Sequence, residues 1–362
     1  MITCSAQTVH TNNIKIREIS SGSPQASSSR SPQEWQSILS HAVTEPEELL
    51  NTLGLNPDLL PGAVTASQSF RIRVPHTYIA RMEHGNPDDP LLKQVLPISD
   101  EMVEAPGFSH DPLGEQPKNS QRGIIHKYQG RLLLMPGSLC AVNCRFCFRR
   151  HFPYDDNKLN KEEWQSALEY IRQDASLKEV ILSGGDPLVQ NDRRLKWLIE
   201  ELANIPHLQR LRIHTRLPVI IPQRVTDDLV NSLTSTRLKS VVVIHSNHPN
   251  EIDHTVSAAL SRLYRAGVQL LNQSTLLKGI NDNAETLAEL SEVLFHNHVM
   301  PYYLHLLDKV QGAAHFEVSE EQARKLVGDM SQFCSGYLVP KLARETAGMP
   351  SKTIISPTYH SI

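Results

Sequence analysis

The sequence contains 362 residues, of which 40% are hydrophobic and 21% are charged, and its formal net charge is −3. This composition is typical of a globular protein with a sizeable core, and the lack of a basic surplus disfavours nucleic acid as a partner. No apolar run reaches the roughly 18 residues that cross a bilayer, and the N-terminus lacks a secretory signal, so we expect a cytoplasmic protein with no membrane contact.

The first part of the chain divides into a polar extension and a helical region. The Ser-rich run SSGSPQASSSRSPQ has almost no large apolar side chain to offset the entropy of ordering, so residues 1–32 are predicted to be a flexible extension. Residues 33–120 contain apolar patterns of helical period interrupted by proline, among them TEPEELLNTLGL, PHTYIARMEHG and LLKQVL. We therefore expect short helices that pack on a larger domain.

Residues 121–340 are predicted to form the core, as a partial (β/α)6 barrel. Amphipathic segments separate six short apolar runs: RLLLM, EVIL, LRIHT, SVVVIH, VQLLNQS and YYLHLL. The helix after the first run is expected to begin at Asn160, a favourable N-cap with Glu163 three residues later. Strands that alternate with helices imply a parallel sheet with right-handed crossovers.

Polar residues follow directly after these apolar runs. They are Cys140, Ser183, Gly184, Gly185, Asp186, Arg216, His245, Asn247, His248, Asn272, Gln273, Ser274 and Asp308. Because the carboxyl ends of parallel strands meet at one edge of a sheet, we expect these residues to surround one ligand cavity.

Three of the five cysteines, Cys140, Cys144 and Cys147, lie in the stretch CAVNCRFCFRRHF with the spacing C-x3-C-x2-C. In a reducing compartment, clustered thiols are more typical of metal ligands than of disulfides. His151 could complete a tetrahedral zinc site, but zinc ligands usually come from two separated hairpins. The other interpretation is a 4Fe-4S cluster that three cysteines hold, with one iron open to another ligand.

The C-x3-C-x2-C motif after a first strand resembles that of the radical S-adenosylmethionine (radical SAM) superfamily. Phe146 before the third cysteine fits that superfamily, and SGGDP resembles its glycine-rich turn after the second strand. The resemblance implies that the open iron binds S-adenosylmethionine, which is cleaved to a 5'-deoxyadenosyl radical. It also implies contacts with this cofactor from the turn, formed by Ser183, Gly184, Gly185 and Asp186.

A narrower resemblance covers roughly residues 35–360 and includes CRFCFRRHF, NHPNE, LLNQSTLLKGINDN, PYYLHLLDKVQGAAHF and GYLVPKLARETAGMPSKT. These motifs resemble the lysine 2,3-aminomutases, isomerases that also use pyridoxal 5'-phosphate. GNPDDPLLKQVLP, APGFSHDPL and LVPKLARE are most similar to the short branch of the family that makes (R)-β-lysine for elongation factor P. The resemblance implies the isomerisation of L-α-lysine to (R)-β-lysine.

The resemblance also assigns the pyridoxal phosphate site. The lysine that binds this cofactor covalently corresponds to Lys352, in a C-terminal segment, residues 341–362; Lys341 is the rival by residue type. The cofactor phosphate is expected to contact Tyr128, Arg131 and Gln273, and a guanidinium suits such a contact. Longer members usually carry arginine at the position of Lys127.

For the amino acid, the family pattern assigns the α-carboxylate to Arg149, two residues after the third cysteine. It assigns the distal ammonium to Asp308 and Glu345, because two carboxylates neutralise one buried cation. Glu345 stands where the family usually has aspartate, and its side chain is one methylene longer.

The resemblance further implies an external electron donor and a separate ligase that attaches the product to elongation factor P. A cysteine that binds interfacial zinc in longer members corresponds to Asn283 here, so that zinc is not expected and a homo-oligomer is left open. Two other interpretations also stay open. They are a radical SAM enzyme of different chemistry and a zinc-stabilised scaffold that binds a protein.

Overall fold

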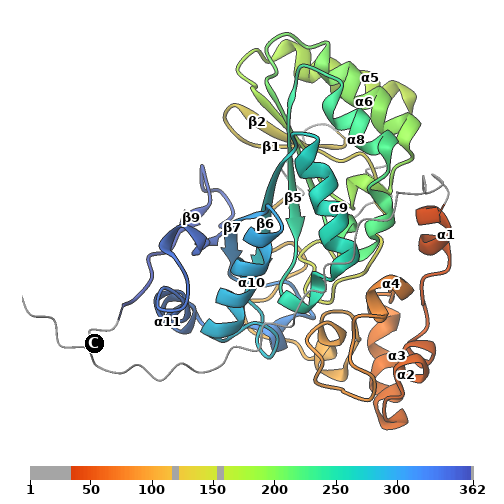
Figure 1. Cartoon of the computed structure of the whole chain (residues 1–362), viewed down its shortest axis with the longest axis vertical. Helices are drawn as coiled ribbons and strands as arrows, with labels where there is room; N and C mark the ends of the chain where they lie inside the picture. The colour runs from red at the N-terminus through yellow and green to blue at the C-terminus, as the bar shows by residue number, and fades with distance from the viewer. Residues whose placement is uncertain (1–33, 116–121, 153–158, 360–362) are drawn as a thin grey trace, which may run out of the picture. The chain divides into compact units, whose positions relative to one another are not determined.

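In the part of the chain that the computed structural model describes, residues 34–115, 122–152 and 159–359, one curved sheet of nine strands forms the centre (Figure 1). Its strands pair in chain order: β1 (Ile124–Tyr128), β2 (Arg131–Leu134), β3 (Glu179–Leu182), β4 (Arg210–Thr215), β5 (Lys239–His245), β6 (Gln269–Thr275), β7 (Met300–His305), β8 (Lys341–Arg344) and β9 (Thr353–Ile354). Strands β2 to β8 are parallel, and β1 and β9 pair antiparallel at the two edges.

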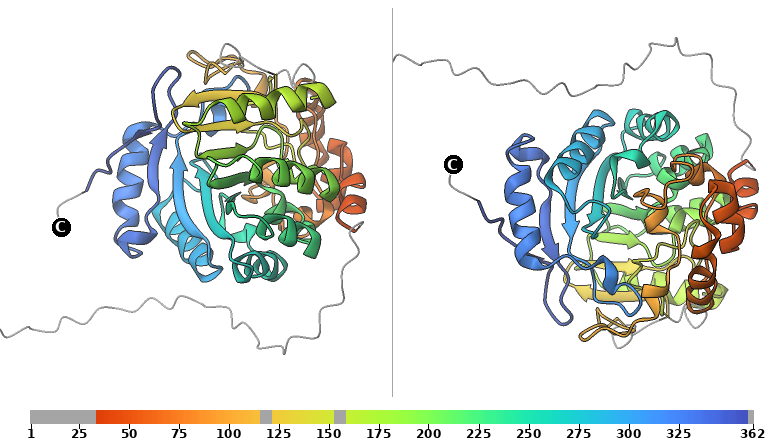
Figure 2. Two further views of the ribbon diagram at one scale, coloured as in Figure 1. Left: turned by 90° about the horizontal axis from the view of Figure 1, so that it is seen from above. Right: turned by 90° about the horizontal axis from the view of Figure 1, so that it is seen from below.

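The expected partial barrel is confirmed, since the six predicted runs are β2 to β7 and pair in the predicted parallel order. No pairing between β1 and β9 closes the sheet among the described residues. Figure 2 shows this open, curved wall from both ends. Strands β1, β8 and β9 were not predicted. They are short and partly exposed, so they carry no apolar run that would reveal them.

Helices alternate with the strands and lie on the outer side of the sheet (Figure 2). Their buried apolar side chains belong to the hydrophobic core. The longer helices are α5 (Lys161–Gln173), α6 (Asp192–Ala203), α8 (Asp227–Thr234), α9 (His254–Arg265), α10 (Ala284–His296) and α11 (Glu320–Met330), and α7 (Leu217–Ile220) is a single turn. The predicted start of α5 is confirmed. Asn160 accepts from the backbone of Glu163 at 2.9 Å, and the Glu163 carboxylate accepts from the backbone of Asn160 at 2.8 Å.

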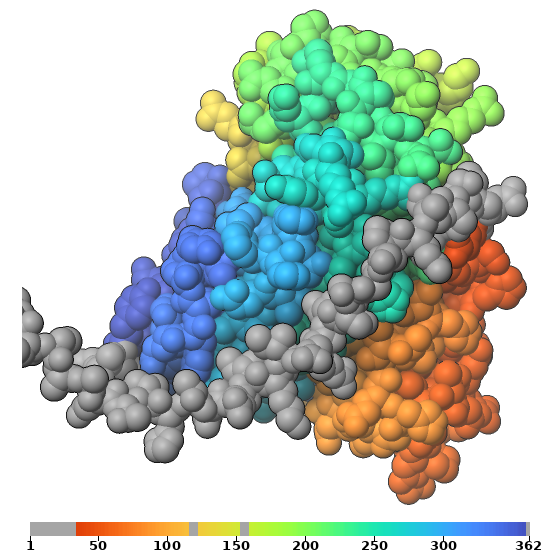
Figure 3. Space-filling view, in the orientation of Figure 1, coloured from red at the N-terminus to blue at the C-terminus, as the bar shows by residue number. Residues whose placement is uncertain are grey.

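The N-terminal region contains the short helices α1 (Glu34–Ser40), α2 (Pro46–Leu53), α3 (Leu60–Ser69) and α4 (His76–Ile79). The pattern LLKQVL forms only a 3-10 turn, Leu92–Gln94, so its predicted helix is a single turn. These helices share one apolar core with the barrel and lie directly against it in Figure 3. Thr77, for example, donates to the carbonyl of Ile220 at 2.7 Å.

The predicted extension, residues 1–32, lies outside the described residues. None of the helices in the described ranges combines the length and apolarity needed to span a membrane.

Candidate active site

A cavity of about 540 Å³ lies inside the curved sheet. Every residue that was assigned a role from the sequence lines it: Tyr128, Arg131, Cys140, Cys144, Cys147, Arg149, Ser183, Gly184, Gly185, Asp186, Gln273, Asp308, Glu345 and Lys352. These residues come from β1, β2, β6 and the segments that follow β2, β3, β7 and β8. The fold therefore brings the three cysteines and the proposed pyridoxal phosphate lysine to the walls of one space.

The expectation that all polar residues after the apolar runs surround this cavity is wrong for Asn247, His248, Asn272 and Ser274, which do not line it. Asn272 and Ser274 alternate with Gln273 along β6 and so lie on its other face, and the backbones of Asn247 and His248 bind Glu251.

The loop after β2 holds Cys140, Cys144 and Cys147 as free thiols. Burial, with the charges of the neighbouring thiols next, raises the pKa of Cys147 to about 11 and that of Cys140 well above its usual value. Buried thiols bind a metal as thiolates, and the charge of the bound cation stabilises that deprotonated form. The donor set therefore fits a metal group of high positive charge.

His151 does not join the three thiols. Its ring stacks on His110 with 4.3 Å between centroids, and its Nε2 lies 3.1 Å from the carbonyl oxygen of Gln311. Within the described ranges, no three His, Cys, Asp or Glu side chains are arranged to hold a single metal ion. The three-thiol set without His151 fits a 4Fe-4S cluster, in which each cysteine binds a different iron.

Residues of the N-terminal region form hydrogen bonds and an ion pair with the cysteine loop. The backbone N–H of Asn143 donates to Arg73 at 3.1 Å, and that of Arg145 donates to Gln94 at 2.9 Å. The fully buried Arg145 also forms an ion pair with Glu101 at 2.6 Å. Because breaking a buried ion pair is costly, these contacts hold the loop in one conformation.

The SGGDP turn packs against the same loop. A Cβ atom on Gly185 would lie 2.7 Å from the carbonyl oxygen of Leu139, so only glycine allows this approach. The Asp186 carboxylate accepts hydrogen bonds from the Thr215 hydroxyl at 2.7 Å and from the Arg216 backbone at 2.8 Å. In this structure the turn thus joins the ends of β3 and β4 to the cysteine loop.

Glu345, which also lines the cavity, contacts three residues. Its Oε2 accepts from Lys352 at 2.5 Å, and its Oε1 accepts from Lys127 at 3.2 Å and from the Tyr128 hydroxyl at 3.1 Å. Burial alone would raise the pKa of Glu345, but the charges of Lys352 and Lys127 lower this pKa to about 2. Glu345 is therefore a permanent anion beside Lys352.

Asp308 lies near Glu345 but behaves differently. Burial, followed by the charge of Glu345, raises the pKa of Asp308 to about 7. Near neutral pH the carboxyl group is therefore about half protonated, and a cation placed beside it would favour its ionised form.

Arg149 is held in a carboxylate-binding geometry. Its Nε and NH2 groups donate to the two oxygens of Glu115 at 2.7 and 3.0 Å, which is the two-point contact that guanidinium groups make with carboxylates. Lys127 also donates to Glu115, at 3.1 Å. In this structure Glu115 is thus a carboxylate partner of Arg149.

The proposed phosphate ligands also lie on the cavity wall. The Arg131 guanidinium is 4.5 Å from the centre of the Tyr128 ring, and Gln273 contributes from β6. Lys341, the rival of Lys352, also lines the cavity, and its Nζ is 6.0 Å from the centre of the Tyr302 ring.

Several cavity residues were not assigned a role from the sequence, notably Glu115, His214, His305 and Arg216. Burial, followed by the charge of Lys352, lowers the pKa of His305 to about 3. His214 and His305 lie inside β4 and β7, so the alternation of side chains along a strand would have revealed both as lumen residues. Glu115 has no such signal, because it precedes the sheet.

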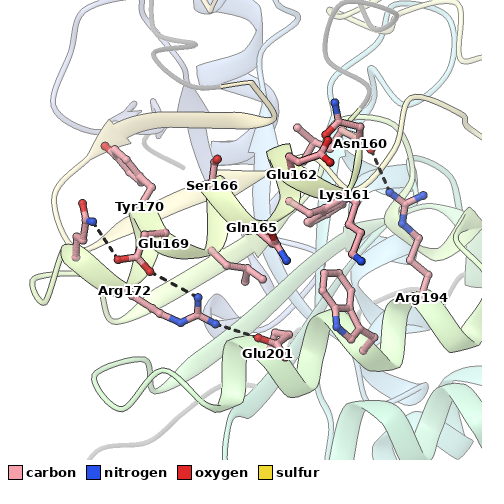
Figure 4. Close-up of a pocket in the computed structure, with 15 residues that line it drawn as sticks. Asn160, Lys161, Glu162, Gln165, Ser166, Glu169, Tyr170, Arg172, Arg194 and Glu201 are labelled. Atoms are coloured by element: carbon pink, nitrogen blue, oxygen red, sulfur yellow. Dashed lines mark hydrogen bonds and ion pairs between the residues drawn. The ribbon is translucent and has the colours of Figure 1, made fainter.

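A second, more open cavity of about 1270 Å³ lies over the outer surface of α5 and α6 (Figure 4). Arg172, which lines this cavity, forms ion pairs with Glu201 at 2.9 Å and with Glu169 at 3.8 Å. No site residue predicted from the sequence lines this cavity.

The fold and the site define a radical SAM protein, and the family model described as the radical SAM superfamily matches residues 134–291. A radical SAM protein implies a 4Fe-4S cluster and S-adenosylmethionine. A solved radical SAM methyltransferase from Sphaerobacter thermophilus aligns over 61% of this chain and 68% of its own, with 17% identity and a TM-score of 0.45.

Curated relatives narrow this class. The L-lysine 2,3-aminomutase of Haemophilus influenzae is 53% identical over 331 residues, which are 91% of this chain and 98% of that protein. The one from Escherichia coli is 54% identical over 89% of this chain and 94% of its own, and the one from Clostridium subterminale is 33% identical over 90% and 78%. The chain belongs to the L-lysine 2,3-aminomutase family, and it is a radical SAM isomerase.

Proposed function

We propose that the enzyme converts L-α-lysine to (R)-β-lysine by moving the amino group from C2 to C3, with a 4Fe-4S cluster, S-adenosylmethionine and pyridoxal 5'-phosphate. The observation that carries this proposal is that one cavity joins three free thiols, Lys352 and the carboxyl pair Asp308 and Glu345. The family relationship over nine-tenths of the chain supports it.

Cys140, Cys144 and Cys147 are proposed to hold the cluster, and Ser183, Gly184, Gly185 and Asp186 to border the S-adenosylmethionine site. The bound cluster supplies the electron that cleaves S-adenosylmethionine and so yields the hydrogen-abstracting 5'-deoxyadenosyl radical. An external electron donor must reduce the cluster. The protein keeps this chemistry inside a walled cavity.

Lys352 is proposed to bind pyridoxal phosphate covalently, and Tyr128, Arg131 and Gln273 to contact its phosphate. This cofactor supplies a carbonyl carbon through which the migrating amino group is carried. In this structure Lys352 donates to Glu345, so its ammonium must lose a proton before it can act as a nucleophile.

The α-carboxylate of lysine is proposed to bind a cationic side chain, and its distal ammonium is proposed to bind anionic side chains. Arg149 already forms a two-point contact with a carboxylate, which is the contact that the α-carboxylate of lysine requires. Asp308 and Glu345 are proposed to bind the distal ammonium. Two carboxyl groups around one cation fix both the charge and the length of the accepted side chain.

We further propose that the enzyme acts in the cytoplasm and that its product is attached by a separate ligase to elongation factor P. The support is the sequence similarity to the short branch of the family and the high identity to the two short relatives.

The test is anaerobic turnover of the reconstituted protein with pyridoxal phosphate, S-adenosylmethionine, dithionite and L-lysine, with separation of α- from β-lysine. We expect (R)-β-lysine and 5'-deoxyadenosine from the wild type and neither product from Cys144→Ala. Deoxyadenosine without β-lysine from a fully loaded wild type would reject free lysine as the substrate.

A further inference from the structure

Arg216 directly follows β4, and its side chain contacts the cysteine loop. Its side chain is only 6% exposed, and its NH1 group lies 2.8 Å from the sulfur of Cys144. Its NH2 group donates to Glu251 at 2.8 Å, to Gln94 at 2.6 Å and to the Tyr78 hydroxyl at 3.1 Å. One nitrogen therefore faces the thiol while another is held by protein acceptors.

Glu251, which accepts a hydrogen bond from the NH2 group of Arg216, is itself held in place by the backbone. Glu251 is fully buried, and its Oε1 accepts from the backbone of Asn247 at 2.8 Å and of His248 at 3.2 Å. Because Glu251 binds NH2 rather than NH1, its negative charge lies farther from the sulfur than the positive charge of Arg216 does.

The Nε group of Arg216 is buried and has no hydrogen-bond partner among the described residues. Arg216 lines the cavity that contains all three cysteines. A buried N–H group that faces a ligand site is normally satisfied by the ligand, because leaving it unpaired is unfavourable. The sulfur atoms of a cluster are acceptors of the required kind.

We propose that Arg216 is a positioning residue for the cluster, donating from NH1 to the Cys144 thiolate and from Nε to a cluster sulfur, and that it thereby raises the reduction potential of the cluster. This inference rests on the proposed cluster site at Cys140, Cys144 and Cys147. Glu251 limits the rise through its opposite charge.

The physical reason lies in the charge of the reduced state. An external donor adds one electron and converts the cluster from the 2+ to the 1+ state, so a nearby cation and N–H donors stabilise the reduced form more than the oxidised one. The closer charge dominates, so Arg216 outweighs Glu251.

The test is a midpoint-potential titration of the reconstituted cluster, followed by electron paramagnetic resonance without S-adenosylmethionine. Glu251→Gln keeps Arg216 and removes the opposing charge, so its potential should rise. The double variant Arg216→Gln with Glu251→Gln leaves no buried unpaired charge, and its potential should fall. At a fixed potential, we expect the ratio of reduced to oxidised cluster to be at least tenfold lower in the double variant than in the wild type. This corresponds to a midpoint potential lower by about 59 mV for a one-electron couple.

Two controls separate this effect from structural damage. Arg216→Lys retains the positive charge and should retain most of the potential. Arg224→Gln perturbs another fully buried arginine, which pairs with Asp192 at 2.7 Å and does not line the cavity, so it should leave the potential unchanged. General structural damage would not shift the midpoint potentials of Glu251→Gln and of the double variant in opposite directions.

Failures of the two proposals are distinguishable. A wild-type protein that binds no iron and sulfide, or a Cys144→Ala variant that binds them equally well, would reject the cluster site itself. Equal iron and sulfide with unchanged potentials in Glu251→Gln and the double variant would overturn the role of Arg216 alone. So would unchanged potentials together with a weaker spectral response to S-adenosylmethionine, because Arg216 would then act on that cofactor.

Discussion

Replacing Asp308 by asparagine should weaken the binding of lysine and remove its pH dependence near neutrality. Because burial and Glu345 raise the pKa of Asp308 to about 7, its carboxyl group is protonated below that pH and ionised above it. The ammonium group of lysine binds the ionised form, so affinity increases as the pH rises through 7. With a pKa of about 7, roughly one tenth of the Asp308 carboxyl groups are ionised at pH 6 and roughly nine tenths at pH 8, so the wild-type KM should be about tenfold higher at pH 6 than at pH 8.

In Asp308→Asn this dependence should disappear, and KM at pH 8 should rise roughly 10- to 100-fold, since a hydrogen bond to a charged group contributes about 1.5 to 3 kcal/mol. The assay is steady-state β-lysine formation between pH 6 and 8, where the ammonium groups of lysine stay protonated. Norleucine, which lacks the distal ammonium, serves as a competing ligand and should bind both proteins similarly. A wild-type KM that stays constant across this range, or an unchanged KM in Asp308→Asn, would refute the reasoning.

Three other changes test separate parts of the site. Lys352→Ala should lose the visible absorbance of lysine-linked pyridoxal phosphate and all turnover while it keeps its iron and sulfide; retained absorbance would move the assignment to another lysine. Glu115→Gln should lower the free energy of unfolding by about 3 kcal/mol in denaturant titrations, because it removes the negative charge from the buried ion pair of Glu115 with Arg149; an unchanged midpoint would contradict this. Gly185→Ala should lower the iron content per chain, because its Cβ would lie 2.7 Å from the backbone of the cysteine loop, whereas Gly336→Ala, with nothing within 4 Å, should not.

Local patterns in the sequence predicted much of the fold. The six strands were readable because each is a short apolar run between amphipathic segments. The start of α5 was readable because Asn160 and Glu163 form a reciprocal cap within four residues. The strands β1, β8 and β9 were not predicted, because they are short and contain few buried residues.

Some residues of the candidate site were predicted from a local motif, and others were not. Cys140, Cys144 and Cys147 are close in sequence and form a motif, whereas Lys352 was selected only through the resemblance to a family. Contacts such as Arg149 with Glu115 join residues far apart in sequence, and no local pattern encodes them.

The proposed cluster ligands and Lys352 line one cavity, so we expect the 5'-deoxyadenosyl radical to take hydrogen directly from C3 of lysine. The most direct measurement is anaerobic turnover with L-lysine deuterated at C3, followed by mass spectrometry of 5'-deoxyadenosine and β-lysine. We expect deuterium in 5'-deoxyadenosine and its return to C2 of β-lysine. Formation of β-lysine with 5'-deoxyadenosine free of deuterium would contradict it.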